Sequence, residues 1–296
     1  MPLTNSQTQI LLEYQDSLPR FLFRGFHSLS GGGIDPRLNS TGGIIPHGFL
    51  GGQIPTSIHD IPNLRGMIDG HLQGRHIPSY FSSWAADLSV AVTYSRLASN
   101  VNTGYIAIID TSLVENHVKI YHVRALFAAG LASGTYAHEY LAYGPITGLA
   151  YHCVRYTNIR QTGMNLLTRS YFQPGLPNLS SFSRSEARNL GARIARVAPL
   201  FRRHGDHRPD VIIAMVAVLI GYDWAITTEA DIKVFGHILI DCFTQFLLQR
   251  LRTNHCPNLG QPQLVNPRTH INNFPRLEHA VRALTWIQER LHGTRH

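Results

Sequence analysis

Short apolar or alternating runs, separated by segments rich in glycine and proline, dominate the first half of the chain. Runs of this length predict β-strands, because successive side chains of a strand point to opposite faces. The predicted strands cover residues 21–24, 79–84, 105–110, 118–123, the run that begins at Glu139, and 149–156. The first half is therefore predicted to be built around a sheet.

Helical spacing of apolar residues appears between these strands. It predicts helices over residues 6–18 and 64–72, and a third helix after Asp87, which stands at the N-cap position. The glycine-rich segment 28–52 lacks the spacing of a phosphate-binding loop, so we expect a mobile loop there. Residues 18–157 thus read as a strand-rich α+β unit.

The pattern changes after Tyr156. Residues 158–183 are polar and contain Pro174, Gly175 and Pro177, which is typical of a linker. Beyond them the apolar residues follow helical spacing, and four helices fit a small all-α domain. The predicted organisation is an α+β domain over 1–157, a linker over 158–183 and a helical domain over 184–296.

Charge narrows the choice of partners. The 296 residues include 26 Lys and Arg against 18 Asp and Glu, a net charge of +8. This balance favours anionic partners such as a dinucleotide, nucleic acid or an acidic membrane surface. The first predicted helix of the second half carries several arginines, which suits such a partner but is more often simply solvated.

The spacing of the cysteines bears on disulfides and metal binding, and the apolar runs bear on the cellular compartment. The three cysteines are widely spaced, so neither a disulfide framework nor a zinc site is predicted, and we expect no metal. No signal peptide is evident, and the longest uncharged apolar run, 211–222, is shorter than the roughly 20 residues that span a bilayer. We expect a soluble intracellular or cytoplasmic protein without a transmembrane segment, and delivery into another cell stays open. The oligomeric state is not predictable.

Glu139 is the most conspicuous candidate for chemistry. It opens an apolar run, and no other acidic residue lies within twenty residues on either side. A single acid at the start of a strand often serves only solubility. Here, however, Arg24 on the first predicted strand and Ser82 and Ser83 on the second precede it. The order arginine, serine, glutamate makes a catalytic role worth testing.

Four motifs carry a resemblance to a known family: Phe23-Arg24-Gly25, the run from Thr41 to Gly48, Phe81-Ser82-Ser83-Trp84, and the run from Glu139 to Ile146. Together they resemble the Arg-Ser-Glu class of ADP-ribosyltransferases, as found in the catalytic domains of the cholera toxin and heat-labile enterotoxin A chains. The likeness covers roughly Leu18 to Tyr156. An uncharacterised domain family widespread in fungi is similar as well.

The resemblance implies a split antiparallel sheet that binds NAD as a substrate and transfers its ADP-ribose to a macromolecular acceptor, a protein or a nucleic acid. Arg24 would hold the ribose-phosphate portion, and Ser82 would orient the nicotinamide ribose or Glu139. Glu139 would stabilise the oxocarbenium ion that forms as nicotinamide leaves. Gly25, Ser83 and Tyr136 complete the predicted NAD-binding residues, Tyr136 from a loop associated with target recognition.

The sequence also departs from the family pattern. Ala137 stands two residues before Glu139, where the family carries Glu or Gln, so hydrolysis of NAD is an alternative to transfer. Trp84 replaces the last serine of the family's Ser-Thr-Ser strand. Adjacent residues on a strand point to opposite faces, which argues against His138 as a substitute base. Asp69 and His71 match a family helix that borders the site, although an ordinary surface helix is the interpretation we favour.

Two other interpretations remain. A catalytically degenerate relative would keep the fold as a binding or interaction module, which Ala137 and Trp84 favour. Alternatively, Arg24 and Glu139 form a buried ion pair that ties two strands together. The side chains of Arg24, Ser82 and Glu139 must meet for the catalytic interpretation to hold.

Overall fold

A computed structural model describes residues 3–15, 18–19, 21–31, 35, 37–51, 54–86, 88–96, 103–136, 138–162 and 196–201, and isolated positions between 183 and 234. The chain divides into two units, Met1–Tyr156 and Thr157–His296. The elements described below belong to the first unit, except for the helix over Tyr156–Gln161, of which only Tyr156 does. Apart from residues 196–201 and those isolated positions, the predicted linker beyond residue 162 and the predicted helical domain lie outside the described residues.

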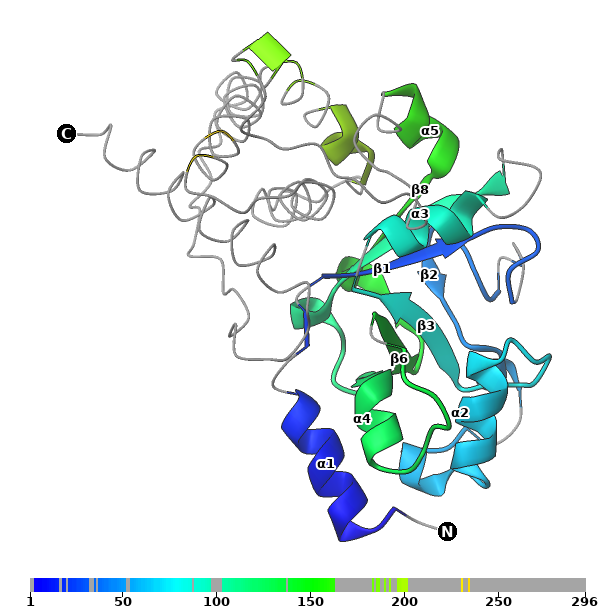
Figure 1. Cartoon of the computed structure of the whole chain (residues 1–296). Helices are drawn as coiled ribbons and strands as arrows, with labels where there is room; N and C mark the ends of the chain where they lie inside the picture. The colour runs from blue at the N-terminus through cyan, green and yellow to red at the C-terminus, as the bar shows by residue number, and fades with distance from the viewer. Residues whose placement is uncertain are drawn as a thin grey trace. The chain divides into compact units, whose positions relative to one another are not determined.

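An antiparallel six-stranded sheet forms the centre of the first unit (Figure 1). Its strands follow the spatial order β5-β6-β3-β1-β4-β8. In sequence order they are β1 (Phe21–Phe26), β3 (Phe81–Ala85), β4 (Tyr105–Asp110), β5 (Lys119–His122), β6 (Glu139–Tyr143) and β8 (Tyr151–Arg155). A separate pair joins β2 (Gly43–Ile44) to β7 (Ile146–Thr147).

The sheet is nearly divided at its middle. β1 and β3 share a single registered pair, Phe23 with Ala85, whereas β1 and β4 pair along their whole length. The strands therefore form two three-stranded halves, β5-β6-β3 and β1-β4-β8, which meet where β1 passes β3. Both β1 and β3 bring the residues singled out above to this junction.

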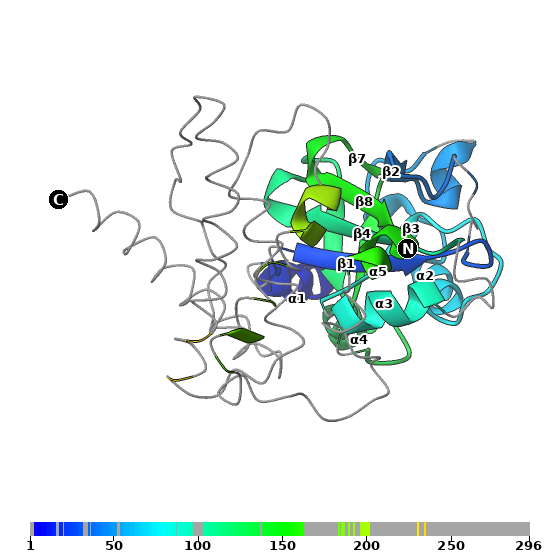
Figure 2. The ribbon, with the colours of Figure 1, turned by 90° about the horizontal axis from the view of Figure 1, so that it is seen from above.

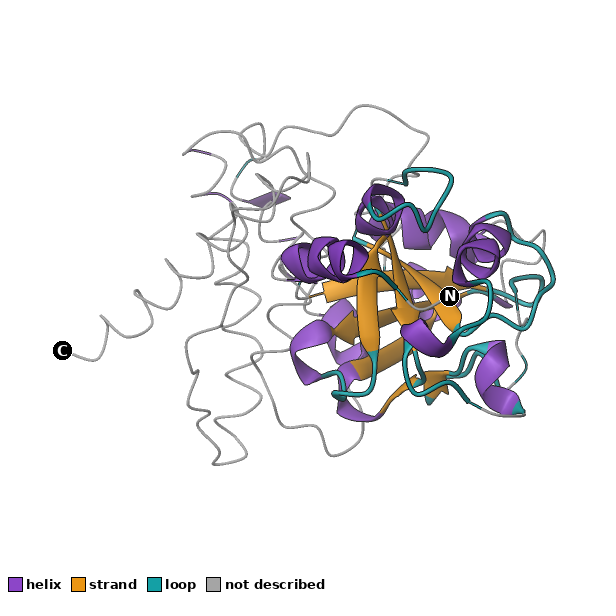
Figure 3. Ribbon diagram, turned by 90° about the horizontal axis from the view of Figure 1, so that it is seen from below, coloured by secondary structure: helices purple, strands orange, loops and turns teal. Residues whose placement is uncertain are grey.

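Helices cover the strands on more than one side (Figure 3). In the first unit the longer ones are α1 (Asn5–Gln15), α2 (Leu64–Leu72), α3 (Leu88–Arg96) and α4 (Val123–Ala128). After β8 the chain continues into α5 (Tyr156–Gln161), which apart from Tyr156 belongs to the second unit. α3 packs directly against β1, as Figure 2 shows. α1 packs against α4 and β5, and Gln7 Nε2 donates to the Ala129 carbonyl at 2.9 Å.

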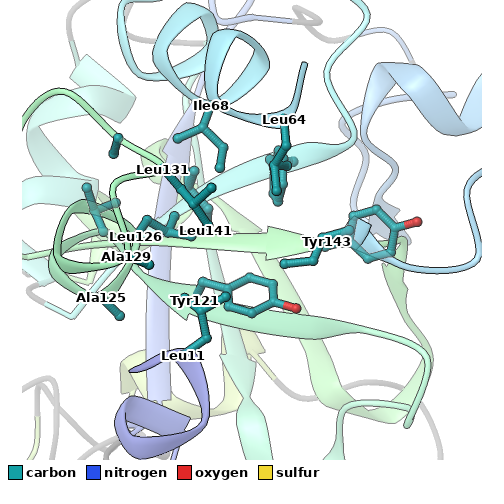
Figure 4. Packing of buried hydrophobic residues seen from close by; sticks show 14 of the residues in the cluster. Leu11, Leu64, Ile68, Tyr121, Ala125, Leu126, Ala129, Leu131, Leu141 and Tyr143 are labelled. Atoms are coloured by element: carbon teal, nitrogen blue, oxygen red, sulfur yellow. The ribbon is translucent and has the colours of Figure 1, made fainter. Parts of the chain in front are cut away.

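A continuous apolar cluster lies between the helices and the β5-β6-β3 half (Figure 4). Ile68 of α2, Leu126 of α4 and Leu141 of β6 are fully buried in it. Tyr143 lies at its edge and donates its hydroxyl to the Pro55 carbonyl. Burial of aliphatic side chains contributes about 1.5–3 kcal/mol each, so this cluster fixes α2 against the sheet.

The mixed α+β class is confirmed, with strands close to the predicted positions. One expectation was incomplete: the run over 118–123 ends as a strand at His122, and α4 follows directly. Another concerns the predicted linker, whose first residues, 158–161, belong to α5. No helix in the described part of the chain is long and apolar enough to cross a bilayer.

Candidate functional site

The register between β3 and β6 places Ser83 and Glu139 on one face of the sheet. Ala85 lies opposite Glu139, and Ser83 lies opposite Leu141. Ser83 and Glu139 are therefore diagonal neighbours, within reach of each other's side chains. The Ser83 side chain hydrogen-bonds the Glu139 carboxylate and favours its ionised form.

Glu139 is a half-buried carboxylate whose environment opposes its charge. Burial raises its pKa above the ordinary value, while the Ser83 hydrogen bond and the charge of Arg24 act in the opposite direction. Burial is the largest of these effects. The protein alone therefore does not fully compensate a negative charge on this carboxyl group.

Arg24 reaches the same group from β1. Its Nη1 donates to the Ser83 carbonyl at 2.7 Å, and Glu139 and Tyr151 are its charge neighbours. Burial lowers the pKa of the guanidinium despite these two neighbours. Its Nε is buried and has no hydrogen-bond partner. A buried donor without a partner costs about 1–3 kcal/mol of folding free energy. A hydrogen bond from this nitrogen to an anionic ligand would therefore recover part of that free energy.

His71 of α2 joins the group through Ser83. Its Nε2 lies 3.0 Å from Ser83 Oγ. Burial, followed by the charge of Arg24, lowers the pKa of His71 to about 4, so the ring is neutral at neutral pH. When Ser83 donates its one hydroxyl proton to Glu139, its Oγ accepts from His71, and the matching tautomer carries the ring proton on Nε2. The result is a chain of hydrogen bonds from His71 through Ser83 to Glu139.

The favoured interpretation of α2 as an ordinary surface helix therefore misses a member of the group. The available signal was the position of His71 within the segment that resembles a family helix at the site border. Asp69, two residues before it, binds the loop that leads toward Glu139.

Ser82 does not join the group, which corrects the expectation that it would contact Glu139. Strand alternation directs Ser82 and Trp84 to the face opposite Ser83. Ser82 is buried, and its Oγ accepts a hydrogen bond from Trp84 Nε1 at 2.9 Å. The tryptophan that replaces the family's last serine thus occupies the Ser82 hydroxyl. Ser83 has the contact that we expected of Ser82.

Gly25 has a packing role, and its predicted contact with NAD stays a prediction. A Cβ atom at this position would stand 1.8 Å from the Ala91 carbonyl oxygen of α3. Only glycine lets α3 approach β1 this closely. Gly43 and Gly48, in the segment that resembles the family's active-site loop, are likewise packed, against Thr147 and the Tyr80 ring. That segment is thus fixed at both glycines by neighbouring side chains.

Two exposed tyrosines border Glu139. Tyr136 is 44% exposed, and its carbonyl accepts from the Glu139 amide at 3.2 Å. Tyr94 of α3 is 55% exposed. Its pKa is raised by burial of part of its side chain and then by the charges of Glu139 and Tyr136. Aromatic rings at the rim of a polar group suit a planar ligand.

Arg24, His71, Ser83 and Glu139 therefore form one connected group, drawn from β1, α2, β3 and β6. It combines a carboxylate, a neutral imidazole, a hydroxyl and a guanidinium with an unpartnered donor. Such a set can bind a phosphate or a ribose and stabilise a developing positive charge. No group of three or more His, Cys, Asp or Glu residues suited to a metal ion occurs among the described residues.

A comparison with protein families finds a match within the first unit. Residues 17–154 match a family described as a domain of unknown function, DUF7587. No curated protein and no solved structure matches the chain. The matched residues run from before β1 into β8 and so include all four members of the group. The similarity leaves the activity to be argued from the site itself.

Proposed function

We propose that this protein consumes NAD: it cleaves the bond between nicotinamide and ribose and transfers ADP-ribose to a macromolecular acceptor or to water. The observation that carries the proposal is the meeting of Arg24, Ser83 and Glu139 in one group. These residue types, on three strands in this order, are those that the resemblance to Arg-Ser-Glu ADP-ribosyltransferases implies. The split of the sheet between β1 and β3 agrees with that fold.

Each residue has a role that follows from its chemistry. Arg24 binds the phosphates or ribose of NAD, and its unpartnered Nε gains an acceptor. Ser83, held by His71, orients the Glu139 carboxylate. Glu139 stabilises the positive charge that grows on the ribose as the glycosidic bond lengthens. Because the carboxylate is half-buried, its interaction with that charge is stronger than in water.

The reaction balances without a metal or a redox partner. The C–N bond between ribose and nicotinamide breaks, and its electron pair neutralises the pyridinium nitrogen as nicotinamide leaves. An oxygen or nitrogen of the acceptor then bonds to the ribose carbon and releases one proton. With water as the acceptor, the product is free ADP-ribose. The replacement of the family's acidic or amide residue by Ala137 favours this hydrolytic outcome.

A binding module without catalysis is the second candidate. The hydrogen bond from Trp84 to Ser82 favours it, because this bond occupies the hydroxyl that the family pattern would use. Such a module would bind NAD, or a related anion, at Arg24 and release no nicotinamide.

Nicotinamide release by the purified chain and by Glu139→Gln tests the proposal. We expect release by the wild type and a loss of about 100-fold or more in the variant, since an aligned charge is removed from the transition state. Binding of NAD without release by the wild type would indicate the module. Absence of both binding and release would overturn the proposal.

The same variant separates catalysis from a structural ion pair. Burial raises the pKa of Glu139 in the folded protein. The protonated carboxyl group therefore contributes to the free energy of unfolding at low pH, and this contribution is lost as pH rises through the raised pKa. Ionised Glu139 therefore opposes folding at neutral pH, and Glu139→Gln should equal or exceed the wild type in urea denaturation at pH 7. A clearly less stable variant would support the ion-pair interpretation instead.

A further inference from the structure

A two-bond contact between α2 and the loop before Glu139 has no role in the scheme above. Asp69 Oδ1 accepts from the Ser133 amide at 2.7 Å, and Asp69 Oδ2 accepts from the Ser133 hydroxyl at 2.5 Å. The two residues are 64 positions apart in the sequence. We call this contact the Asp69–Ser133 clasp. Charged acceptors make hydrogen bonds about twice as strong as neutral ones, so the contact is a firm one.

The clasp pins one end of a short segment. Leu131 and Ala132 are buried just before Ser133, whereas Ser133, Thr135 and Tyr136 are exposed. At the other end, the Ala86 amide donates to the His138 carbonyl at 2.9 Å, immediately before Glu139. Only the residues between Ser133 and His138 bridge the two anchors, and among them is Tyr136.

α2 holds both sides of the site at once. Asp69 binds the loop, and His71, two residues later on the same helix, binds Ser83 of β3. Ile68 next to Asp69 is fully buried in the apolar cluster, which fixes the helix itself. A rigid helix therefore sets the position of the loop relative to the strand that orients Glu139.

We propose that Asp69 is a positioning residue of the site: through Ser133 it holds the loop that delivers Tyr136 and Glu139 to Arg24 and Ser83. The inference rests on the proposed NAD cleavage. A displacement of about 1 Å in a reacting group can cost about 100-fold in rate, so loss of the clasp should reduce turnover without removing any group that touches NAD.

Three variants test the clasp by nicotinamide release. Asp69→Ala removes both bonds and should lower kcat tenfold or more, with a smaller change in KM because Arg24 is intact. Asp69→Asn should recover most of the rate: its amide oxygen can accept from the Ser133 amide, and its amide nitrogen can donate to the Ser133 hydroxyl. Ser133→Ala removes only the bond from the hydroxyl, so its kcat should lie between those of Asp69→Ala and Asp69→Asn.

Asp60 provides a matched control. Its carboxylate accepts from Thr56 Oγ1 at 2.7 Å and from the Ser57 amide at 3.1 Å, a similar pair of bonds within one local turn. Asp60→Ala should leave kcat within about twofold of the wild type. Equal losses in Asp60→Ala and Asp69→Ala would mean a general loss of stability, which overturns a positioning role.

Hydrogen exchange separates failure of the clasp from failure of the proposed function. In Asp69→Ala, the amides of residues 133–139 should exchange faster than in the wild type and in Asp60→Ala. An unchanged rate of exchange, or wild-type turnover in Asp69→Ala, overturns the clasp alone. Absence of nicotinamide release by the wild type overturns the proposed cleavage, and the catalytic role of the clasp with it.

Discussion

Ser82 and Ser83 are adjacent in sequence but differ in what each hydroxyl does. Ser82 accepts from the buried Trp84 indole, whereas Ser83 links His71 to Glu139. Ser82→Ala leaves the indole N–H unpartnered and should cost about 1–3 kcal/mol of unfolding free energy, with nicotinamide release preserved in the folded protein. Ser83→Ala should show the reverse, a reduced rate with little loss of stability. Urea denaturation and nicotinamide release, measured on both variants, check the pair.

The opposite pattern, a loss of activity confined to Ser82→Ala, would return the orienting role to Ser82. Each variant serves as the control for the other, because both remove one hydroxyl from the same strand.

His71 gives the protein a predictable dependence on pH. Its pKa falls from 6.5 to about 4 on folding. At a pH between these values, the imidazole is therefore protonated in the unfolded chain and neutral in the folded chain. Stability should therefore decrease as pH falls from about 6.5 toward 4. Relative to His71→Gln, which does not titrate, the wild type should lose on the order of 1–2 kcal/mol of unfolding free energy between pH 7 and pH 5.

Urea denaturation at the two pH values measures this difference, and the other titrating groups cancel in the comparison with the variant. Parallel changes in the wild type and His71→Gln would show that the imidazole protonates equally in both states. The ring would then be more accessible than its contact with Ser83 indicates.

At the level of elements, the close packing of α3 against β1 requires a residue without a side chain at position 25. The Cβ of an alanine at position 25 would meet the Ala91 carbonyl oxygen at 1.8 Å and the Ser95 amide nitrogen at 2.7 Å. Backbone atoms of a helix cannot move individually, so Gly25→Ala should cost roughly 1–3 kcal/mol or more. Gly51→Ala is the control, because no atom lies within 4 Å of its added Cβ and its φ of −164° suits any residue. Urea denaturation of both variants makes the comparison.

A destabilisation of Gly25→Ala no greater than that of Gly51→Ala would mean that α3 shifts away from β1 at little cost. In that case Gly25 would be available for the contact with NAD that the resemblance implies.

The elements show what periodicity can and cannot predict. Helix 64–72 and strand 105–110 match the structure at both ends, because each apolar pattern is bounded by polar or turn-forming residues. The end of β5 was missed because apolar residues continue from Val118 into α4, and a short apolar run fits either period. The spacing of apolar residues also predicted the strands that carry Arg24 and Glu139. It did not give the register of β3, where a shift of one residue exchanges Ser82 for Ser83.

The contact of His71 with Ser83 could not be predicted from the sequence for a different reason. A helix can be placed from its own apolar pattern, but the strand that its polar residues face is set by tertiary packing. Leu64 and Ile68 bury α2 against the sheet, and this packing brings His71 to Ser83 and Asp69 to Ser133. Each contact joins two segments that are separated in the sequence, and the sequence does not predict how the chain between them runs in space.

At the scale of the molecule, the site and its support are contained in the first unit. Every member of the apolar cluster lies between Leu11 and Tyr143, and the four site residues lie between Arg24 and Glu139. A fragment of residues 1–162 includes these, the edge strand β8 and all of α5. A chain of this length buries enough surface to fold by itself. We therefore expect this fragment to unfold in one cooperative transition.

Trp84 makes that expectation easy to measure. It is the only tryptophan of the fragment, since the others are Trp224 and Trp286, and it is 1% exposed beside Ser82 on β3. Its fluorescence and the far-ultraviolet circular dichroism should change together in urea, because both follow the same sheet. If the proposed cleavage holds, the fragment should release nicotinamide at a rate within a few-fold of the full chain. Separate transitions, or a solvent-exposed Trp84, would show that the second unit is needed to complete the fold around Glu139.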